Sequence, residues 1–147
     1  MLEFRILGPL EVAADSEPLQ LSGQKQRALL ALLLLDANRV VSTDRIVDAL
    51  WGEEPPRTAA TSLQNFVSQL RKLLGSDVVV TKPPGYQLRI EPEQLDLERF
   101  TRLVEESRAE PPAGRAAKLR RALALWRGPP LADLGFEAFA QQEIGRL

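Results

Sequence analysis

The residues best suited to chemistry in this sequence lie between Arg57 and Leu74, where hydrogen-bonding side chains occur without any carboxylate. Asp and Glu account for 20 of the 147 residues, yet none falls in this stretch. Amide side chains can bridge adenine edges in the major groove of DNA, and hydroxyls fit base edges or phosphates. On a helix, one face would present Thr58, Thr61, Asn65, Ser68, Gln69 and Lys72, with Ser62, Gln64 and Arg71 at its edges. These side chains predict contact with nucleic acid.

A solvated outer face on a structural helix is the alternative interpretation, and the distribution of charge decides against it. The whole chain has a net charge of −1, which is not the basic footprint typical of nucleic-acid binding. Residues 57–89, however, hold a single acid, Asp77, against five bases: Arg57, Arg71, Lys72, Lys82 and Arg89. A local positive surface therefore survives in a nearly neutral protein.

Catalysis has little support in this composition. The sequence has no cysteine and no histidine, which removes thiolate nucleophiles, zinc-thiolate sites and every Ser-His-Asp arrangement. The neighbouring carboxylates Glu53 and Glu54 have no phosphate loop, metal cluster or nucleophile–base pair beside them. We therefore expect a protein that is not an enzyme and that holds no metal and no cofactor.

A cytoplasmic protein without a membrane partner is the further expectation. The longest apolar run, Ala28–Leu35, falls far short of the roughly 20 residues needed to cross a bilayer. The first residues, Met1–Arg5, lack the basic region and the cleavage site of a signal peptide.

The elements that must position the polar face follow from hydrophobic patterning. Three short alternating stretches predict an antiparallel sheet, a Leu-rich segment predicts a buried helix, and two further helices and a hairpin follow. The expected strands are Leu2–Leu7, Leu10–Val12 and Leu19–Leu21, followed by helices at Gln24–Ala37, Thr43–Trp51 (capped by Ser42) and Thr58–Leu74, with Arg39–Val41 as an extended link. The closing strands are Val78–Thr81 and Tyr86–Ile90, around Lys82–Gly85. Three helices followed by a two-stranded wing are the layout of a winged helix-turn-helix.

The core of this arrangement and its secondary contacts with DNA can also be assigned. Leu63, Val67, Leu70 and Leu74 form the expected buried stripe of the third helix, and Trp51 is expected between the second and third helices. Phosphate contacts are expected from the hairpin and from the start of the first helix, although a stiff turn and simple capping are the alternatives there. These candidates are Gln24, Lys25, Arg57, Lys82, Gly85 and Tyr86.

From about residue 94 the pattern becomes helical throughout. Asp96 is expected to cap a helix, and Pro111-Pro112 to break it. A second helix is expected over Ala113–Trp126, with a third beginning near Phe136. The apolar stripe expected on the second helix is Ala116, Leu119, Leu123 and Trp126.

Several stretches of the sequence resemble the actinobacterial antibiotic regulatory proteins known as SARPs. Residues 21–33, 38–52 and 63–75 are similar to the three helices of their OmpR/PhoB-type winged domain, and residues 96–100 and 122–131 to the start of their bacterial transcriptional activation domain. The resemblance implies a DNA-binding domain over residues 1–91, followed over 94–147 by the first part of an all-α, tetratricopeptide-like segment that continues in a longer protein. Where family members often carry an arginine, this sequence has Gln69, which alters the expected base preference and leaves the fold unchanged.

What the resemblance implies for function is a transcriptional activator of an antibiotic biosynthesis cluster. Such proteins bind direct repeats in promoter DNA near the −35 element as two protomers, and they recruit RNA polymerase through the sigma factor and other subunits. The loop expected to touch polymerase is Glu53, Glu54, Pro55 and Pro56, and a solvated acidic loop without a partner is the alternative there. A protein-interaction module that uses the winged fold without binding DNA is the alternative.

Overall fold

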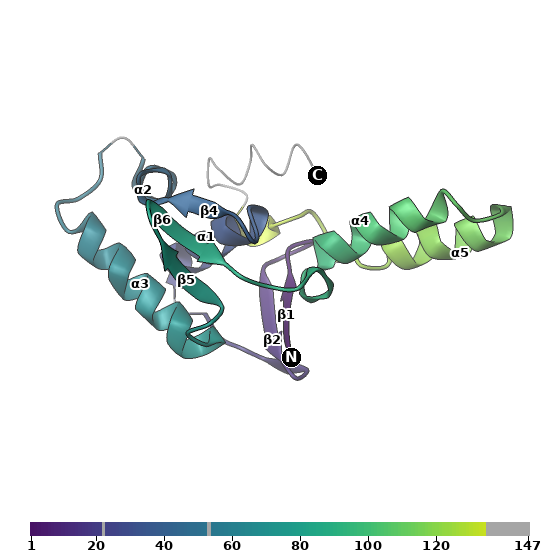
Figure 1. Ribbon diagram of the computed structural model, residues 1–147, viewed down its shortest axis with the longest axis horizontal. Helices are drawn as coiled ribbons and strands as arrows, with labels where there is room; N and C mark the ends of the chain where they lie inside the picture. The colour runs from purple at the N-terminus through teal and green to yellow at the C-terminus, as the bar shows by residue number, and fades with distance from the viewer. Residues whose placement is uncertain (22, 53, 135–147) are drawn as a thin grey trace. The chain divides into compact units, whose positions relative to one another are not determined.

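The computed structural model describes residues 1–21, 23–52 and 54–134 (Figure 1). Its contacts divide the chain into two compact units. The first unit joins Met1–Pro18 to Glu91–Asp133, and the second contains Leu19–Ile90. The contacts thus group the opening sheet with residues beyond 90. The expected boundary between domains at 91–94 stays a prediction. Among the described residues, no helix combines the length and the apolar character that crossing a membrane requires.

The first unit opens with a three-stranded antiparallel sheet in the order β1-β2-β3. Its strands are β1 (Leu2–Arg5), β2 (Glu11–Ala14) and β3 (Glu17–Pro18). The prediction of a third strand at Leu19–Leu21 is wrong by two residues, because the turn is shorter than expected. Asp15 and Ser16, with φ of 49° and 71°, make it alone, so the chain re-enters the sheet at Glu17.

Two helices complete the first unit as a hairpin, α4 (Asp96–Ser107) and α5 (Pro112–Leu123), which lie side by side (Figure 1). The short 3₁₀ helices η1 (Pro92–Gln94) and η2 (Ala132–Leu134) flank them along the chain. Phe100 of α4 meets Trp126 edge to face, with ring centroids 5.6 Å apart. The third helix expected from Phe136 lies outside the described residues.

The apolar stripe predicted for α5 is wrong in two of its positions. Leu123 is 64% exposed and Ala116 is exposed, whereas Ala122 is completely buried. Polar side chains of α5 reach α4 instead, since Nε of Arg115 donates to the carbonyl of Ser107 at 3.2 Å and the ammonium of Lys118 donates to the carboxylate of Glu106 at 3.0 Å.

Asp96 has a different partner from the one expected. It is the first residue of α4, buried at 2% exposure, and no side-chain hydrogen bond caps the helix. Its two carboxylate oxygens instead accept hydrogen bonds from the backbone N–H groups of Ile6 at 2.9 Å and Leu7 at 3.0 Å. Burial raises the pKa of the Asp96 carboxyl above its ordinary value, against the opposing effect of these backbone donors.

The second unit is built around α1 (Gly23–Leu35), which is buried nearly all round, as its Leu- and Ala-rich sequence predicts. After the helix the chain turns at Asn38, whose φ of 67° lies in the left-handed region. The Asn38 side chain fixes the end of the unit, because its Oδ1 accepts from Ile90 N–H and its Nδ2 donates to Ile90 C=O, both at 3.0 Å.

The next two helices confirm the prediction closely. α2 (Thr43–Trp51) begins at Ser42, whose hydroxyl accepts from Arg45 N–H at 3.1 Å, and it ends at Gly52. α3 (Ala59–Leu74) ends at Gly75. The stripe predicted as core is buried along its length at Leu63, Val67, Leu70 and Leu74.

The sheet of the second unit contains one strand more than expected, in the order β4-β6-β5. The hairpin is β5 (Val79–Lys82) and β6 (Gly85–Leu88), and the segment predicted as an extended link is strand β4 (Val40–Ser42), which pairs with β6. The close pairing needs a glycine at Gly85, where a Cβ would overlap the carbonyl oxygen of Val41.

Candidate nucleic-acid interface

The outer face of α3 carries the polar side chains that the sequence predicted for it, and they reach the surface. Two of the predicted residues, Ser62 and Arg71, are half-buried at the edges of the face. The others are exposed: Thr58 at the N-cap, then Thr61, Gln64, Asn65, Ser68, Gln69 and Lys72. The helix therefore separates a leucine and valine side, which is buried, from an amide and hydroxyl side, which is open.

One of these side chains, Gln69, is hydrogen-bonded to a buried residue of α1. Gln26 of α1 is only 2% exposed, and its Nε2 donates a hydrogen bond to Oε1 of Gln69 at 3.2 Å. An amide whose oxygen is engaged in this way presents its N–H₂ group outward. Sequence patterning missed Gln26, and its one signal was a polar residue at the start of a Leu- and Ala-rich helix.

Arg71 was predicted as a DNA contact, and the structure gives its guanidinium partners within the protein. Its Nε donates to the carbonyl of Val79 at 2.9 Å, and its Nη2 donates to Oγ1 of Thr81 at 2.6 Å. Both acceptors belong to β5. Arg71 therefore ties the polar helix to the hairpin.

The hairpin places its predicted residues unequally. Lys82 is exposed at the end of β5, beside the Pro83-Pro84 turn, and Tyr86 is half-buried. Gly85 is buried by close strand packing, so the structure gives it a packing role, whereas Lys82 is an exposed cation of the wing.

At the start of α1, the predicted phosphate contacts have neighbours inside the unit. The ammonium of Lys25 donates to the carbonyl of Leu50 and lies 5.7 Å from the ring centroid of Trp51. Trp51 stacks on Phe66 of α3, with ring centroids 6.4 Å apart, and this confirms the expectation that it lies between α2 and α3. Gln24 is half-buried, and its Nε2 is the one buried side-chain atom without a partner within the described part of the chain.

The loop between α2 and α3 is open to solvent where it is described. Glu54, Pro55, Pro56 and Arg57 are all exposed, and the predicted contact residue Glu53 lies outside the described residues. Residues 1–21, 23–52 and 54–134 hold no group of three or more metal-ligating side chains. The geometry is that of a surface made for hydrogen bonds and charge.

Two family models match the chain in the order that the fold suggests. Residues 16–88 match the model described as "Transcriptional regulatory protein, C terminal", and residues 95–147 match the "Bacterial transcriptional activator domain". Both describe transcriptional regulators rather than enzymes.

Curated relatives are similar to this chain over both of the matched regions. The transcriptional regulatory protein EmbR of Mycobacterium tuberculosis is 41% identical over 143 residues, which cover 90% of this chain and 37% of EmbR. The regulatory protein DnrI of Streptomyces peucetius is 33% identical over 161 residues, which cover 99% of this chain and 59% of DnrI. The chain therefore spans less than two thirds of either relative.

A solved structure, that of Mycobacterium tuberculosis EmbR in complex with a low affinity phosphopeptide, is similar over 99% of this chain and 41% of its own, with a TM-score of 0.91 and 39% identity. The winged arrangement of α1 to β6, the helical segment that follows it, the two family models and these relatives agree with one another. The chain belongs to the SARP family of transcriptional regulators, in which an OmpR/PhoB-type winged helix-turn-helix is followed by a bacterial transcriptional activator domain.

Proposed function

We propose that this chain is a sequence-specific DNA-binding activator whose α3 enters the major groove. The observation that carries the proposal is the exposed, carboxylate-free face of α3, which contains Asn65, Gln69 and Lys72. Amides are suited to base edges, and Lys72 in the last turn is suited to phosphate. Lys82 of the wing contacts the neighbouring backbone, and Arg71 holds the wing in register with the helix.

The partners follow from family membership and are part of the same proposal. The protein acts in the cytoplasm, where two copies bind direct repeats near the −35 element of a promoter. The bound copies recruit RNA polymerase through its sigma factor. The exposed loop around Glu54, Pro55 and Pro56 is the proposed polymerase contact, and genes for antibiotic biosynthesis are the proposed targets. The helical segment after residue 94 supports pairing or polymerase contact.

The test begins with selection of a duplex from a random pool by the 147-residue chain. Fluorescence anisotropy then compares that duplex with a scrambled one at several salt concentrations. We expect the affinity to fall steeply with salt because binding releases counterions, and to be about a thousandfold or more higher for the selected duplex.

Lys72→Ala separates backbone contact from base reading. It is expected to weaken binding to all duplexes alike and to reduce the salt slope by about 0.9, the contribution of one phosphate. Arg120→Ala removes one charge from an exposed position of α5 and is the matched control, with no change in slope expected.

Equal affinity for selected and scrambled duplexes, or affinity that does not depend on salt, contradicts the proposal. Charge reversal at Lys72 and Lys82 distinguishes the alternative, because it should abolish DNA binding. A chain that still binds a protein partner after both reversals would be a protein-interaction module instead.

A further inference from the structure

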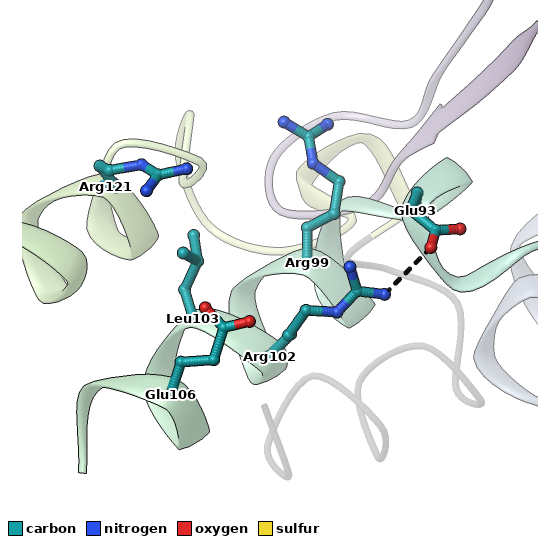
Figure 2. Close-up of a pocket in the computed structure, with 6 residues that line it drawn as sticks. All are labelled: Glu93, Arg99, Arg102, Leu103, Glu106 and Arg121. Carbon is teal, nitrogen blue, oxygen red and sulfur yellow. Dashed lines mark hydrogen bonds and ion pairs between the residues drawn. The ribbon is translucent and has the colours of Figure 1, made fainter. Parts of the chain in front are cut away.

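A pocket in the first unit lies outside every surface that the proposed DNA contact uses. It has a volume of about 260 Å³ and is lined by η1, α4 and α5 through Glu93, Arg99, Arg102, Leu103, Glu106 and Arg121 (Figure 2). Pockets that hold cofactors or drug-sized molecules usually measure about 300 to 1,000 Å³. This pocket is suited to one side chain or one small anion.

The carboxylates that line the pocket are already neutralised. Glu93 accepts from Nη2 of Arg102 at 3.3 Å, and its pKa is lowered by a hydrogen bond with its own backbone and by Arg102. Glu106 accepts from the ammonium of Lys118 at 3.0 Å, and Glu110 shares that ammonium at 3.2 Å. These bonds raise the pKa of Lys118, so the three charges form a closed cluster.

Two arginines that line the pocket have no such partner among the described residues. Neither Arg99 nor Arg121 has a side-chain hydrogen bond or an ion pair with any residue in the described ranges of the chain. Figure 2 shows the guanidinium of Arg121 reaching from α5 toward Leu103, while Arg99 extends from α4. Each guanidinium has five N–H donors and no acceptor, so the pocket offers surplus positive charge beside an apolar side chain.

We propose that this pocket binds an acidic side chain on a peptide segment of a partner protein. The guanidinium groups of Arg99 and Arg121 hold its carboxylate or phosphoryl group, and Leu103 contacts an apolar residue next to it. Arginine pairs with carboxylate and phosphoryl groups through two parallel hydrogen bonds, a geometry that the ammonium of a lysine cannot reproduce.

The size and the lining of the pocket favour a peptide over the backbone of DNA. The volume of about 260 Å³ admits one compact anion and does not accommodate a long polyanion. The apolar side chain of Leu103 in the lining adds affinity for an aliphatic neighbour and none for a phosphate chain.

The experiment titrates the full chain with three labelled, end-capped hexapeptides that alternate Leu with Glu, with phosphoserine or with Gln. Anisotropy gives the affinities, and the arginine Nε–Hε signals in NMR spectra show which side chains respond. We expect binding of the two acidic peptides, whose comparison distinguishes carboxylate from phosphoryl, and shifts at Arg99 and Arg121. The Gln peptide should not bind.

Arg99→Gln and Arg121→Gln are each expected to weaken binding of the acidic peptides about tenfold, as loss of hydrogen bonds to a charged group does. Arg120→Gln is the matched control, because it removes the same charge one residue away, from an exposed position that does not line the pocket. It should change the affinity less than about twofold, the range expected for a screened surface charge. Thermal unfolding followed by circular dichroism checks that each variant is folded.

The inference is overturned if neither acidic peptide binds at low salt, or if Arg120→Gln weakens binding as much as the two pocket variants do. It is also overturned if Arg99→Gln and Arg121→Gln weaken binding of duplex DNA instead, since DNA would then be the occupant. Because this pocket is a separate surface, Lys72→Ala should leave peptide binding unchanged. Failure here and failure of the DNA proposal are therefore distinguishable.

Discussion

Asn65 lies in the middle of the exposed polar face of α3, where a single amide can be tested against a single base pair. Asn65→Ala is expected to reduce discrimination at one position of the selected duplex by about 1–3 kcal/mol, because a side chain that bridges a base edge is lost. Anisotropy with a panel of single-base variants measures this. Gln20→Ala, at an exposed position outside α3, is the control. Equal weakening on every duplex would show that Asn65 reads no base.

The buried amide of Gln26 gives a second residue-scale prediction, because it orients Gln69 without being exposed itself. Gln26→Met keeps the length of the side chain and removes its N–H donors. The Gln69 amide then rotates freely, so we expect broader base preference at one position and an unchanged salt slope. The same panel of duplexes measures both. Unchanged preference in Gln26→Met would show that the contact does not set specificity.

The residues of the site could largely be predicted from the sequence, and their internal bonds could not. Exposure of Asn65 and Lys72 follows from helical periodicity alone, since the opposite face is apolar. The bonds of Gln69 to Gln26 and of Arg71 to Val79 depend on where α1 and β5 pack, which a single helix does not encode.

At the scale of elements, the buried side of α3 is what attaches the helix to the second unit. Leu70 is fully buried, and Leu70→Ala is expected to lower the free energy of unfolding by about 2–5 kcal/mol through lost burial and the cavity left behind. Urea unfolding followed by circular dichroism measures it. Leu123→Ala is the matched control, because Leu123 is 64% exposed, and it should cost less than about 0.5 kcal/mol. Similar costs for both variants would contradict this assignment of the buried side.

Elements with strong local signals could be predicted, and those that depend on a partner could not. α2 has a hydroxyl cap, both helices end at a glycine and have clear periodicity, and their observed bounds agree with the prediction to within a residue. β4 is three residues long and is a strand only because β6 lies beside it. The face of α5 was misassigned because polar side chains, Arg115 and Lys118, contact α4, and a pattern of apolar residues does not mark them.

At the scale of the molecule, Asp96 joins two chain segments 90 residues apart within the first unit. Asp96→Asn is expected to lower the free energy of unfolding by about 1–3 kcal/mol, because one amide oxygen cannot accept from the N–H groups of both Ile6 and Leu7. Thermal or urea unfolding measures the change. Asp77→Asn, at an exposed position, is the control and should be close to neutral.

The pH dependence of this difference tests the charge state of Asp96. Its pKa is raised in the folded protein, so the folded state binds the proton more tightly than the unfolded state does. The stabilisation by wild-type Asp96 over Asn is therefore greatest below about pH 4, the ordinary pKa range of aspartate, and falls as the pH rises through the raised folded value. A difference that grows with pH over this range would show that the backbone donors outweigh burial.

The first unit is assembled from both flanks of the second, so in sequence Leu19–Ile90 is an insertion within a host. The second unit is the part that we propose reads DNA. Moving it into a related regulator therefore requires two junctions, after residues 18 and 90. A single cut after residue 91 would carry a foreign opening sheet along with the foreign α3. The recipient's residue at the position of Asp96 would then face backbone amides that come from the donor. Hybrid regulators with new promoter preference should accordingly keep the two flanks from one parent.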